Sequence, residues 1–228
     1  MTVLDNLNKI HQRIERACAK ADKNPENVQI VAVTKTVAVE RIEEALQAGI
    51  HMIGENKVQE AWMKYPLIGS KAAWHFIGHL QTNKVKRALQ FSNVIESLDS
   101  LHLAREIQTK ALDRAEPIEV FVQVNTSGEK SKFGINPADL PDFVYQLAEL
   151  DKIRVTGLMT LGFYADDPEK VRPCFSLLRE LKEHINQQKI PTIRLCHLSM
   201  GMTNDYEVAV EEGATLVRLG QALFGERK

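Results

Sequence analysis

Cysteine is scarce in this sequence, and its spacing argues against two kinds of structural site. The 228 residues include three cysteines, Cys18, Cys174 and Cys196, which lie far apart along the chain. Three such residues cannot build a disulfide framework, and none of the spacings is the close CxxC that is typical of zinc sites. Each lies in an apolar stretch, so we expect all three to be buried as small hydrophobic side chains, and we predict no bound metal.

Long hydrophobic runs and an excess of charge of one sign are also missing. No run reaches the 18 apolar residues of a membrane span, and the opening MTVLDNLNKIHQRIERA has no apolar core of the signal-peptide type. The net charge is −1, and lysines and arginines are spread along the whole chain, so no basic surface for nucleic acid is indicated. We therefore expect a cytoplasmic protein that binds neither membranes nor nucleic acid.

The length and composition are those of one globular domain. The hydrophobic share is 44% and the charged share is 26%, and both values are ordinary for a soluble fold. A chain of 228 residues buries enough apolar surface to need no covalent staples. We predict a single domain over residues 1–228, and a barrel of this size is viable as a monomer.

Short apolar, often β-branched, runs alternate with amphipathic helical stretches along the chain. After a first helix that ends near Asn24-Pro25, the predicted strands are 29–35, 51–54, 74–78, 93–97, 118–124, 153–160, 192–199 and 215–220. Helices are predicted between them at 38–48, 56–64, 81–90 and 100–113, and three more begin at Asn136-Pro137, at Asp167-Pro168 and at Asn204, where Glu207 completes a capping box.

Eight strands separated by helices favour parallel pairing and closure into a (β/α)8 TIM barrel with an extra N-terminal helix. An open doubly wound sheet is the competing fold. The strand count and the absence of a glycine-rich fingerprint after the first strand make it the weaker interpretation.

In such a barrel, the residues at the carboxyl ends of the strands face one shared mouth, where active sites form. Scattered polar residues would meet there: Lys35, Glu55, Asn56, His79, Asn125, Ser199, Arg218 and Gly220. Lys35 follows the apolar run 30–33. A lysine in an apolar mouth loses hydration of its ammonium, which makes the neutral amine easier to reach, and that amine attacks aldehydes. The alternative is a lysine that extends from the strand end into solvent.

The loops after the last two predicted strands have the features of an anion site. HLSMGMTND contains a hydroxyl, a glycine and the start of a short helix, and Gly220 lets backbone amides approach an anion. A phosphate at one side of the mouth and an amine at the other suit a phosphorylated aldehyde. Arg218 would face a pyridine nitrogen or the phosphate, or it would form an ion pair with Glu55 or another carboxylate of the mouth.

The remaining charged and histidine residues carry weaker predictions. His75 lies inside a strand and is expected in the core, His197 is expected to be structural, and His79 is placed at the mouth. Lys130 and Lys132, in the loop GEKSKFG, are interpreted as a solvated charge run that borders the mouth and would guide an anion.

Seven blocks of the sequence resemble one known family. AVTKT, GEN with VQE, WHFIGHLQTNK, GEKSKFGI, GLMT, LSMGMTND and VRLGQALFG occur in the order seen in the YggS/PROSC family of pyridoxal phosphate homeostasis proteins. The similarity runs from about residue 28 to residue 225. It implies a barrel like the N-terminal domain of alanine racemase and the cofactor pyridoxal 5′-phosphate, held as a Schiff base on Lys35. It also implies cofactor contacts from Asn56 at the ring pocket, from Arg218 at the pyridine nitrogen, and from Ser199, Gly220 and Gln221 at the phosphate.

The resemblance also has departures. Val39 stands where the racemase has a tyrosine that contacts the phosphate, and the sequence ends soon after FGERK begins, with no room for the β-domain of the racemase. In the racemase that domain supplies a partner tyrosine as the second acid/base, and a two-base racemase needs a proton donor on each face. We therefore expect no robust catalysis and name no catalytic residue.

Three hypotheses remain open at this point. The first is a cofactor carrier or buffer that affects cofactor supply and amino-acid balance, with pyridoxal-phosphate-dependent enzymes as partners. The second is an amino-acid racemase or decarboxylase whose mouth is completed by another subunit. The third is a lysine-dependent aldolase barrel that binds a sugar phosphate and no coenzyme, against which the seven blocks argue.

Overall fold

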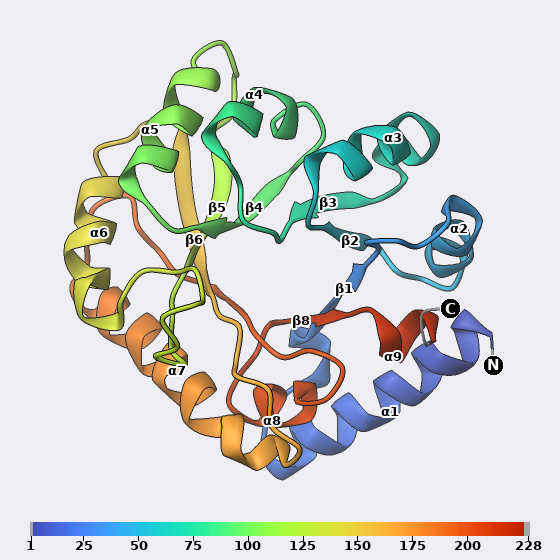
Figure 1. Cartoon of the computed structure of the whole chain (residues 1–228). Coiled ribbons are helices and arrows are strands. Elements are labelled where there is room, and N and C mark those ends of the chain that lie inside the picture. The colour runs from blue at the N-terminus through green and yellow to red at the C-terminus, as the bar shows by residue number, and fades with distance from the viewer. Residues whose placement is uncertain (1, 226–228) are drawn as a thin grey trace.

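The strands form one closed parallel barrel. In the computed structural model, which describes residues 2–225, each strand pairs with the next along the chain, and the last pairs with the first (Figure 1). The strands are β1 (Gln29–Val33), β2 (Met52–Glu55), β3 (Ala73–Phe76), β4 (Val94–Leu98), β5 (Ile118–Gln123), β6 (Ile153–Met159), β7 (His197–Ser199) and β8 (Leu216–Leu219). The (β/α)8 barrel is confirmed, and the open doubly wound sheet was the wrong alternative. The predicted domain bounds, 1–228, extend beyond the described residues.

Helices surround the barrel. They are α1 (Val3–Lys20), α2 (Val39–Gln47), α3 (Val58–Ile68), α4 (Val85–Ala88), α5 (Leu101–Lys110), α6 (Leu140–Leu147), α7 (Arg172–Gln187), α8 (Tyr206–Glu211) and α9 (Gln221–Phe224). The extra N-terminal helix α1 begins with a capping box between Thr2 and Asp5, and it packs beside α2, α8 and α9 (Figure 1). None of the helices within residues 2–225 is both long and apolar enough to cross a lipid bilayer.

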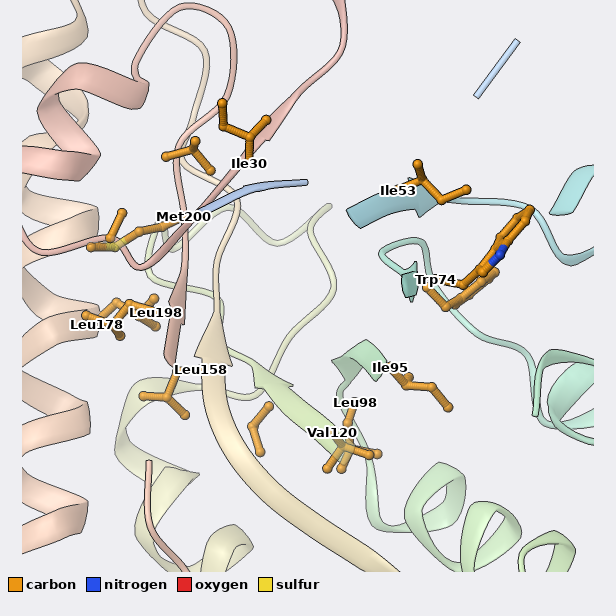
Figure 2. Close-up of a cluster of buried hydrophobic side chains, with 14 of the residues drawn as sticks. Ile30, Ile53, Trp74, Ile95, Leu98, Val120, Leu158, Leu178, Leu198 and Met200 are labelled. Atoms are coloured by element: carbon orange, nitrogen blue, oxygen red, sulfur yellow. The ribbon is translucent and has the colours of Figure 1, made fainter. Parts of the chain in front are cut away.

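The core has two parts because strand side chains alternate in direction. One set fills the layer between the strands and the helices, and Figure 2 shows members of this layer from β1 to β7, with Leu198 next to Leu178 of α7. The alternate residues form a smaller apolar cluster inside the barrel: Val31, Val94, Phe121, Met159 and Leu216. Residues at odd-numbered positions of β1, such as Val31, therefore face the barrel interior. The same alternation decides where the side chains just after β1 point.

Two predicted elements near the end of the chain differ from the structure. The strand predicted over 192–199 shrinks to β7, because the side chain of Asn186 bonds both the backbone N–H and the carbonyl of Leu195, each at 2.9 Å. The capping box at Asn204 was wrong: Asp205 is the N-cap of α8, and Glu207 instead forms an ion pair with Arg13.

Two further expectations also need correction. The helix predicted to stop at residue 64 continues to Ile68 as α3 in spite of Pro66, because buried Ile68 anchors the last turn in the core. Cys18 and Cys174 are buried as predicted, but Cys196 is exposed, because it lies just before β7 on the outer surface.

Candidate functional site

A pocket of about 660 Å³ opens at the carboxyl ends of the strands. Residues that follow β1, β2, β3, β5, β6, β7 and β8 line it, so positions far apart in sequence meet at one rim. The predicted site residues in its wall are Lys35, Asn56, Arg218, Gly220 and Gln221, whereas Ser199 lies outside that wall. The shared mouth expected from the barrel is therefore present.

Lys35 lies at the first strand end and lines the pocket. Val31 belongs to the cluster inside the barrel, Val33 lines the pocket, and Lys35 continues this alternation. Thr34, between them, points to the opposite side and has no exposed surface. The alternation of β1 thus aims the amine into the pocket rather than along the outer surface.

The peptide groups beside Lys35 are held by a buried ion cluster that sequence reasoning missed. The ammonium of Lys64, on α3, contacts the Thr34 carbonyl at 2.6 Å and an oxygen of both Glu55 and Glu60 at 2.7 Å. Lys64 is only 8% exposed. Lys64 falls on the core side of its helix, and this position could have indicated the cluster, because a buried ammonium needs hydrogen-bond acceptors.

The backbone on the other side of Lys35 is fixed by the same cluster. Thr36 donates its backbone N–H to Glu60 at 2.5 Å and has a φ of 62°, in the left-handed region. Burial alone would raise the pKa of Glu60, but the hydrogen bonds from Lys64 and Thr36 hold it below its ordinary value. Both neighbours of Lys35 are therefore anchored to side chains of β2 and α3.

Glu55, the carboxylate named by the sequence analysis as a partner for Arg218, bonds other residues. Its Oε1 accepts from Lys64 and from the Thr34 hydroxyl, each at 2.7 Å, while its buried Oε2 has no hydrogen-bond partner. Burial raises the pKa of Glu55 in spite of these two donors. The ion pair between Arg218 and Glu55 is not formed.

Asn56 follows β2 and lines the pocket. Its side-chain oxygen is buried and has no hydrogen-bond partner in the described residues. A buried amide oxygen without a donor costs free energy, so it is a position where a ligand donor is favoured.

Arg218, on β8, lines the same pocket while only 3% of its surface is exposed. Its Nη1 donates to the Ser199 hydroxyl and its Nη2 to the Thr160 carbonyl, each at 2.6 Å. Burial lowers the pKa of the guanidinium, and the carboxylates of Glu96 and Asp205 oppose that shift. Since a guanidinium has five N–H donors, further donors are left for a molecule in the pocket.

Ser199 is predicted at the phosphate, and the structure places its hydroxyl below the pocket wall. The hydroxyl donates to Glu96 Oε2 at 2.5 Å and accepts from Arg218. Glu96 is a carboxylate that the sequence analysis missed, although a charged residue inside an apolar strand was a visible signal.

The predicted phosphate end is formed by the loops after β7 and β8. Met202, Thr203 and Asn204 line the pocket beside Gly220 and Gln221. Gly201 has a φ of 91°, and a Cβ there would lie 2.6 Å from the Cβ of Ala209, so this turn requires glycine. At Gly220 an added Cβ would make only ordinary contacts with Val33.

The opposite wall carries two stacked rings. His79 lies over Phe133 with ring centroids 3.9 Å apart, and its Nδ1 bonds Asp99 at 3.1 Å. Burial raises the pKa of Asp99, and His79 opposes that shift. His79 is therefore at the mouth, as predicted.

The other histidine and lysine predictions have mixed outcomes. His75 is buried in β3 against Glu96, and His197 stacks on Phe121, so neither lines the pocket. Lys130 is exposed as predicted, but Lys132 is not a solvated side chain: it lines the pocket and donates to the Gly162 carbonyl at 2.9 Å.

Comparisons with known proteins agree with this geometry. The family described as alanine racemase, N-terminal domain, matches residues 6–228. A pyridoxal phosphate homeostasis protein of Aquifex aeolicus is 42% identical over 229 residues, with all of both chains covered. PipY of Synechococcus elongatus, solved with pyridoxal phosphate bound, is 34% identical with a TM-score of 0.81, covering 93% of this chain and 100% of that one.

Alanine racemase of Clostridium difficile has the same barrel at 16% identity. The TM-score is 0.74, and the match covers 98% of this chain and 56% of the racemase chain. A similarity at this level of identity shows the fold alone. The match over the whole chain to relatives well above 30% identity carries the conclusion: the protein belongs to the family of pyridoxal phosphate homeostasis proteins, built on the barrel of the alanine racemase N-terminal domain.

Proposed function

We propose that this protein binds pyridoxal 5′-phosphate as a Schiff base on Lys35 and takes part in the homeostasis of that cofactor. The observation that carries the proposal is the meeting of Lys35, Arg218 and the loops after β7 and β8 around one pocket. An amine and an anion site that open into one cavity match the aldehyde and the phosphate of a phosphorylated aldehyde.

The polar atoms of the pocket fit this cofactor. Asn56 offers a buried acceptor without a donor, which suits a ring hydroxyl, and Arg218 keeps donors toward the pocket. Gly220, Gln221 and the 202–204 loop supply backbone and side-chain groups for the phosphate. We assign Ser199 to the same site through its hydrogen bond to Arg218 rather than through a wall contact.

When bound, pyridoxal phosphate supplies an aldehyde that condenses reversibly with primary amines. Lys35 provides the amine and must lose a proton from Nζ before it reacts. The cluster of Lys64, Glu55 and Glu60 holds the peptides on both sides of Lys35, which orients the side chain. Arg218 carries a charge, so a ring nitrogen that it contacted would stay unprotonated.

This arrangement favours a carrier or buffer over a racemase. A racemase needs a proton donor on both faces of the ligand, and Lys35 accounts for one face only. The recipients of the cofactor, the monomeric state and the cytoplasmic location stay predictions.

An absorption spectrum of the purified protein tests the proposal. We expect a visible band that Lys35→Ala abolishes and that Lys71→Ala, a change of an exposed lysine, leaves intact. Borohydride reduction followed by peptide mass analysis should place a pyridoxyl adduct on Lys35, whereas a sugar adduct would favour the aldolase hypothesis. A band that survives in dialysed Lys35→Ala would overturn the assignment.

The carrier and the racemase differ in proton exchange at the substrate. We expect slow solvent deuterium exchange at the α-carbon of added amino acids. Fast exchange, with turnover at ordinary enzyme rates, would favour the racemase instead.

A further inference from the structure

A chain of four polar side chains crosses the barrel interior below the pocket. His75 on β3, Glu96 on β4, Ser199 on β7 and Arg218 on β8 are 4%, 0%, 0% and 3% exposed. The cluster of apolar residues inside the barrel surrounds them. Polar groups in such a place cost free energy unless each is paired, so their arrangement is informative.

The hydrogen bonds among these four side chains converge on Glu96, from His75 on one side and from Ser199 and Arg218 on the other. Glu96 accepts from His75 Nδ1 at Oε1, at 2.6 Å, and from the Ser199 hydroxyl at Oε2, at 2.5 Å. The single hydroxyl proton of Ser199 is thereby used, and its oxygen accepts from Arg218 Nη1 at 2.6 Å. Each donor has an acceptor, and the chain ends at the guanidinium that lines the pocket.

The charges in this chain stabilise one another. Burial alone would raise the pKa of Glu96, but the hydrogen bonds from His75 and Ser199 and the charge of Arg218 hold it below its ordinary value. Glu96 in turn opposes the loss of charge at buried Arg218. A buried guanidinium without a nearby anion would be strongly destabilising, so Glu96, together with Asp205, acts as a counter-ion at this position.

The same contacts fix the plane of the guanidinium. Ser199 holds Nη1 and the Thr160 carbonyl holds Nη2, so two of the three nitrogens are tethered on the side away from the pocket. Since Ser199 is oriented by its own bond to Glu96, the carboxylate determines where the remaining donors of Arg218 point.

We propose that Glu96 is a positioning residue for Arg218, acting through the Ser199 hydroxyl to hold the guanidinium toward the ring end of the bound cofactor. The inference rests on the proposed function only in the identity of that ligand. The orientation of Arg218 is a property of the protein by itself.

The first test needs no cofactor. In the unbound protein, the side-chain nitrogen NMR signals of Arg218 should show restricted rotation and slow proton exchange. Glu96→Gln removes the negative charge, and its amide has only one oxygen to accept the two hydrogen bonds from His75 and Ser199. We therefore expect faster rotation and faster proton exchange at the Arg218 side chain. Unchanged Arg218 signals in Glu96→Gln would overturn the inference, whatever the protein binds.

The second test uses pyridoxal phosphate as the probe. Glu96→Gln and Ser199→Ala should each weaken its affinity about tenfold and alter the band shape of the bound cofactor. The double variant should lose no more than the stronger single variant, because both changes act on the same contact. Full additivity of the two losses would contradict the relay through Ser199.

A matched control separates this role from general damage to the barrel. Glu119→Gln makes the same chemical change on β5, where the carboxylate bonds Thr156 at 2.8 Å. It should leave affinity, band shape and the Arg218 signals unchanged. If Glu96→Gln fails to fold, Ser199→Ala, a smaller change, carries the NMR test. A wild-type protein that binds no pyridoxal phosphate would refute the proposed function and leave the NMR result on Arg218 decisive.

Discussion

Two carboxylates of this barrel have no exposed surface: Glu55 lies outside the ring of strands, against α3, and Glu96 lies inside it. Both are buried among apolar neighbours, yet the pKa of Glu55 is raised and the pKa of Glu96 is lowered. In Glu96 both oxygens accept hydrogen bonds, whereas Oε2 of Glu55 accepts none. Complete pairing, rather than depth of burial, decides which form of a buried carboxyl group is favoured.

The number of cations per carboxylate also differs. Lys64 is shared between Glu55 and Glu60, and Glu60 receives a further donor from the Thr36 backbone. Glu55 and Glu60 thus each contact the same ammonium at 2.7 Å, and each has one further donor, which for Glu55 is the Thr34 hydroxyl. The cluster outside the barrel therefore has one ammonium for two carboxylates, and four predictions test how it differs from the hydrogen-bonded network around Glu96.

The largest effect is expected for Lys64→Met. Removing the shared ammonium leaves two carboxylates without their cation, and breaking a buried ion pair costs about 3–5 kcal/mol in the free energy of unfolding. Urea unfolding measures the loss, and adding Glu55→Gln to the variant should recover part of it. A loss below about 1 kcal/mol would mean that the cluster is more hydrated than its burial indicates.

A smaller loss is expected for Thr34→Val, which keeps the shape of the side chain and removes the second donor to Glu55. One buried hydrogen bond to a charged group is lost, which costs about 1.5–3 kcal/mol. The same unfolding measurement applies, and the loss should shrink when Glu55 is already Gln. An equal loss in both backgrounds would show that Glu55 does not depend on this hydroxyl.

The dependence of stability on pH should have opposite signs for the two carboxylates. With a lowered native pKa, Glu96 stabilises the fold above its unfolded pKa of about 4.3, and this contribution disappears as the pH falls through the native pKa. With a raised native pKa, Glu55 favours the fold below about pH 4.3, and this contribution is lost as the pH rises through the native pKa.

Each unit of pKa difference corresponds to about 1.4 kcal/mol. Glu55→Gln should therefore gain stability relative to wild type as the pH rises from 4 to 7, and Glu96→Gln should lose its disadvantage as the pH falls below about 4.3. Unfolding curves over this pH range measure both differences. Parallel curves for the two variants would break the comparison.

The smallest effect is expected for Lys71→Ala, which removes an exposed ion pair with Glu43. Side-chain exposures of 59% and 40% allow water to screen this pair, so the change should stay within about 0.5 kcal/mol. The stability change of this variant gives the reference value for an ion pair that is not buried. A cost similar to that of Lys64→Met would show that burial is not the controlling variable.

The barrel and the direction of Lys35 could be predicted because both follow from local periodicity. Eight apolar runs separated by helices have few arrangements, and alternation along β1 decides where Lys35 points. The positions of Asn56 and Arg218 at the pocket could be predicted for the same reason. Asn56 directly follows β2, and Arg218 lies near the end of β8.

The counter-ions could not be predicted because their contacts join residues that are far apart in sequence. Ser199 lies 103 residues beyond Glu96, and Lys64 lies 30 residues beyond Thr34. Strand registers decide these meetings, and a shift of one residue would turn each side chain to the other face. The error at Asn204 has a local cause, since α8 begins one position later, after Asp205, whose side chain accepts from the Met202 backbone N–H rather than from the helix.

The pairing of β1 with β8 also has a consequence for biosynthesis. Val31 lies opposite Arg218, so the first and last strands form the seam that carries both Lys35 and Arg218. A ribosome releases β8 only after almost all other strands have been made, and closing so long a segment is slow. During synthesis, Lys35 is therefore made early, whereas the pocket is completed last. The pocket is therefore complete only once β8 has paired with β1.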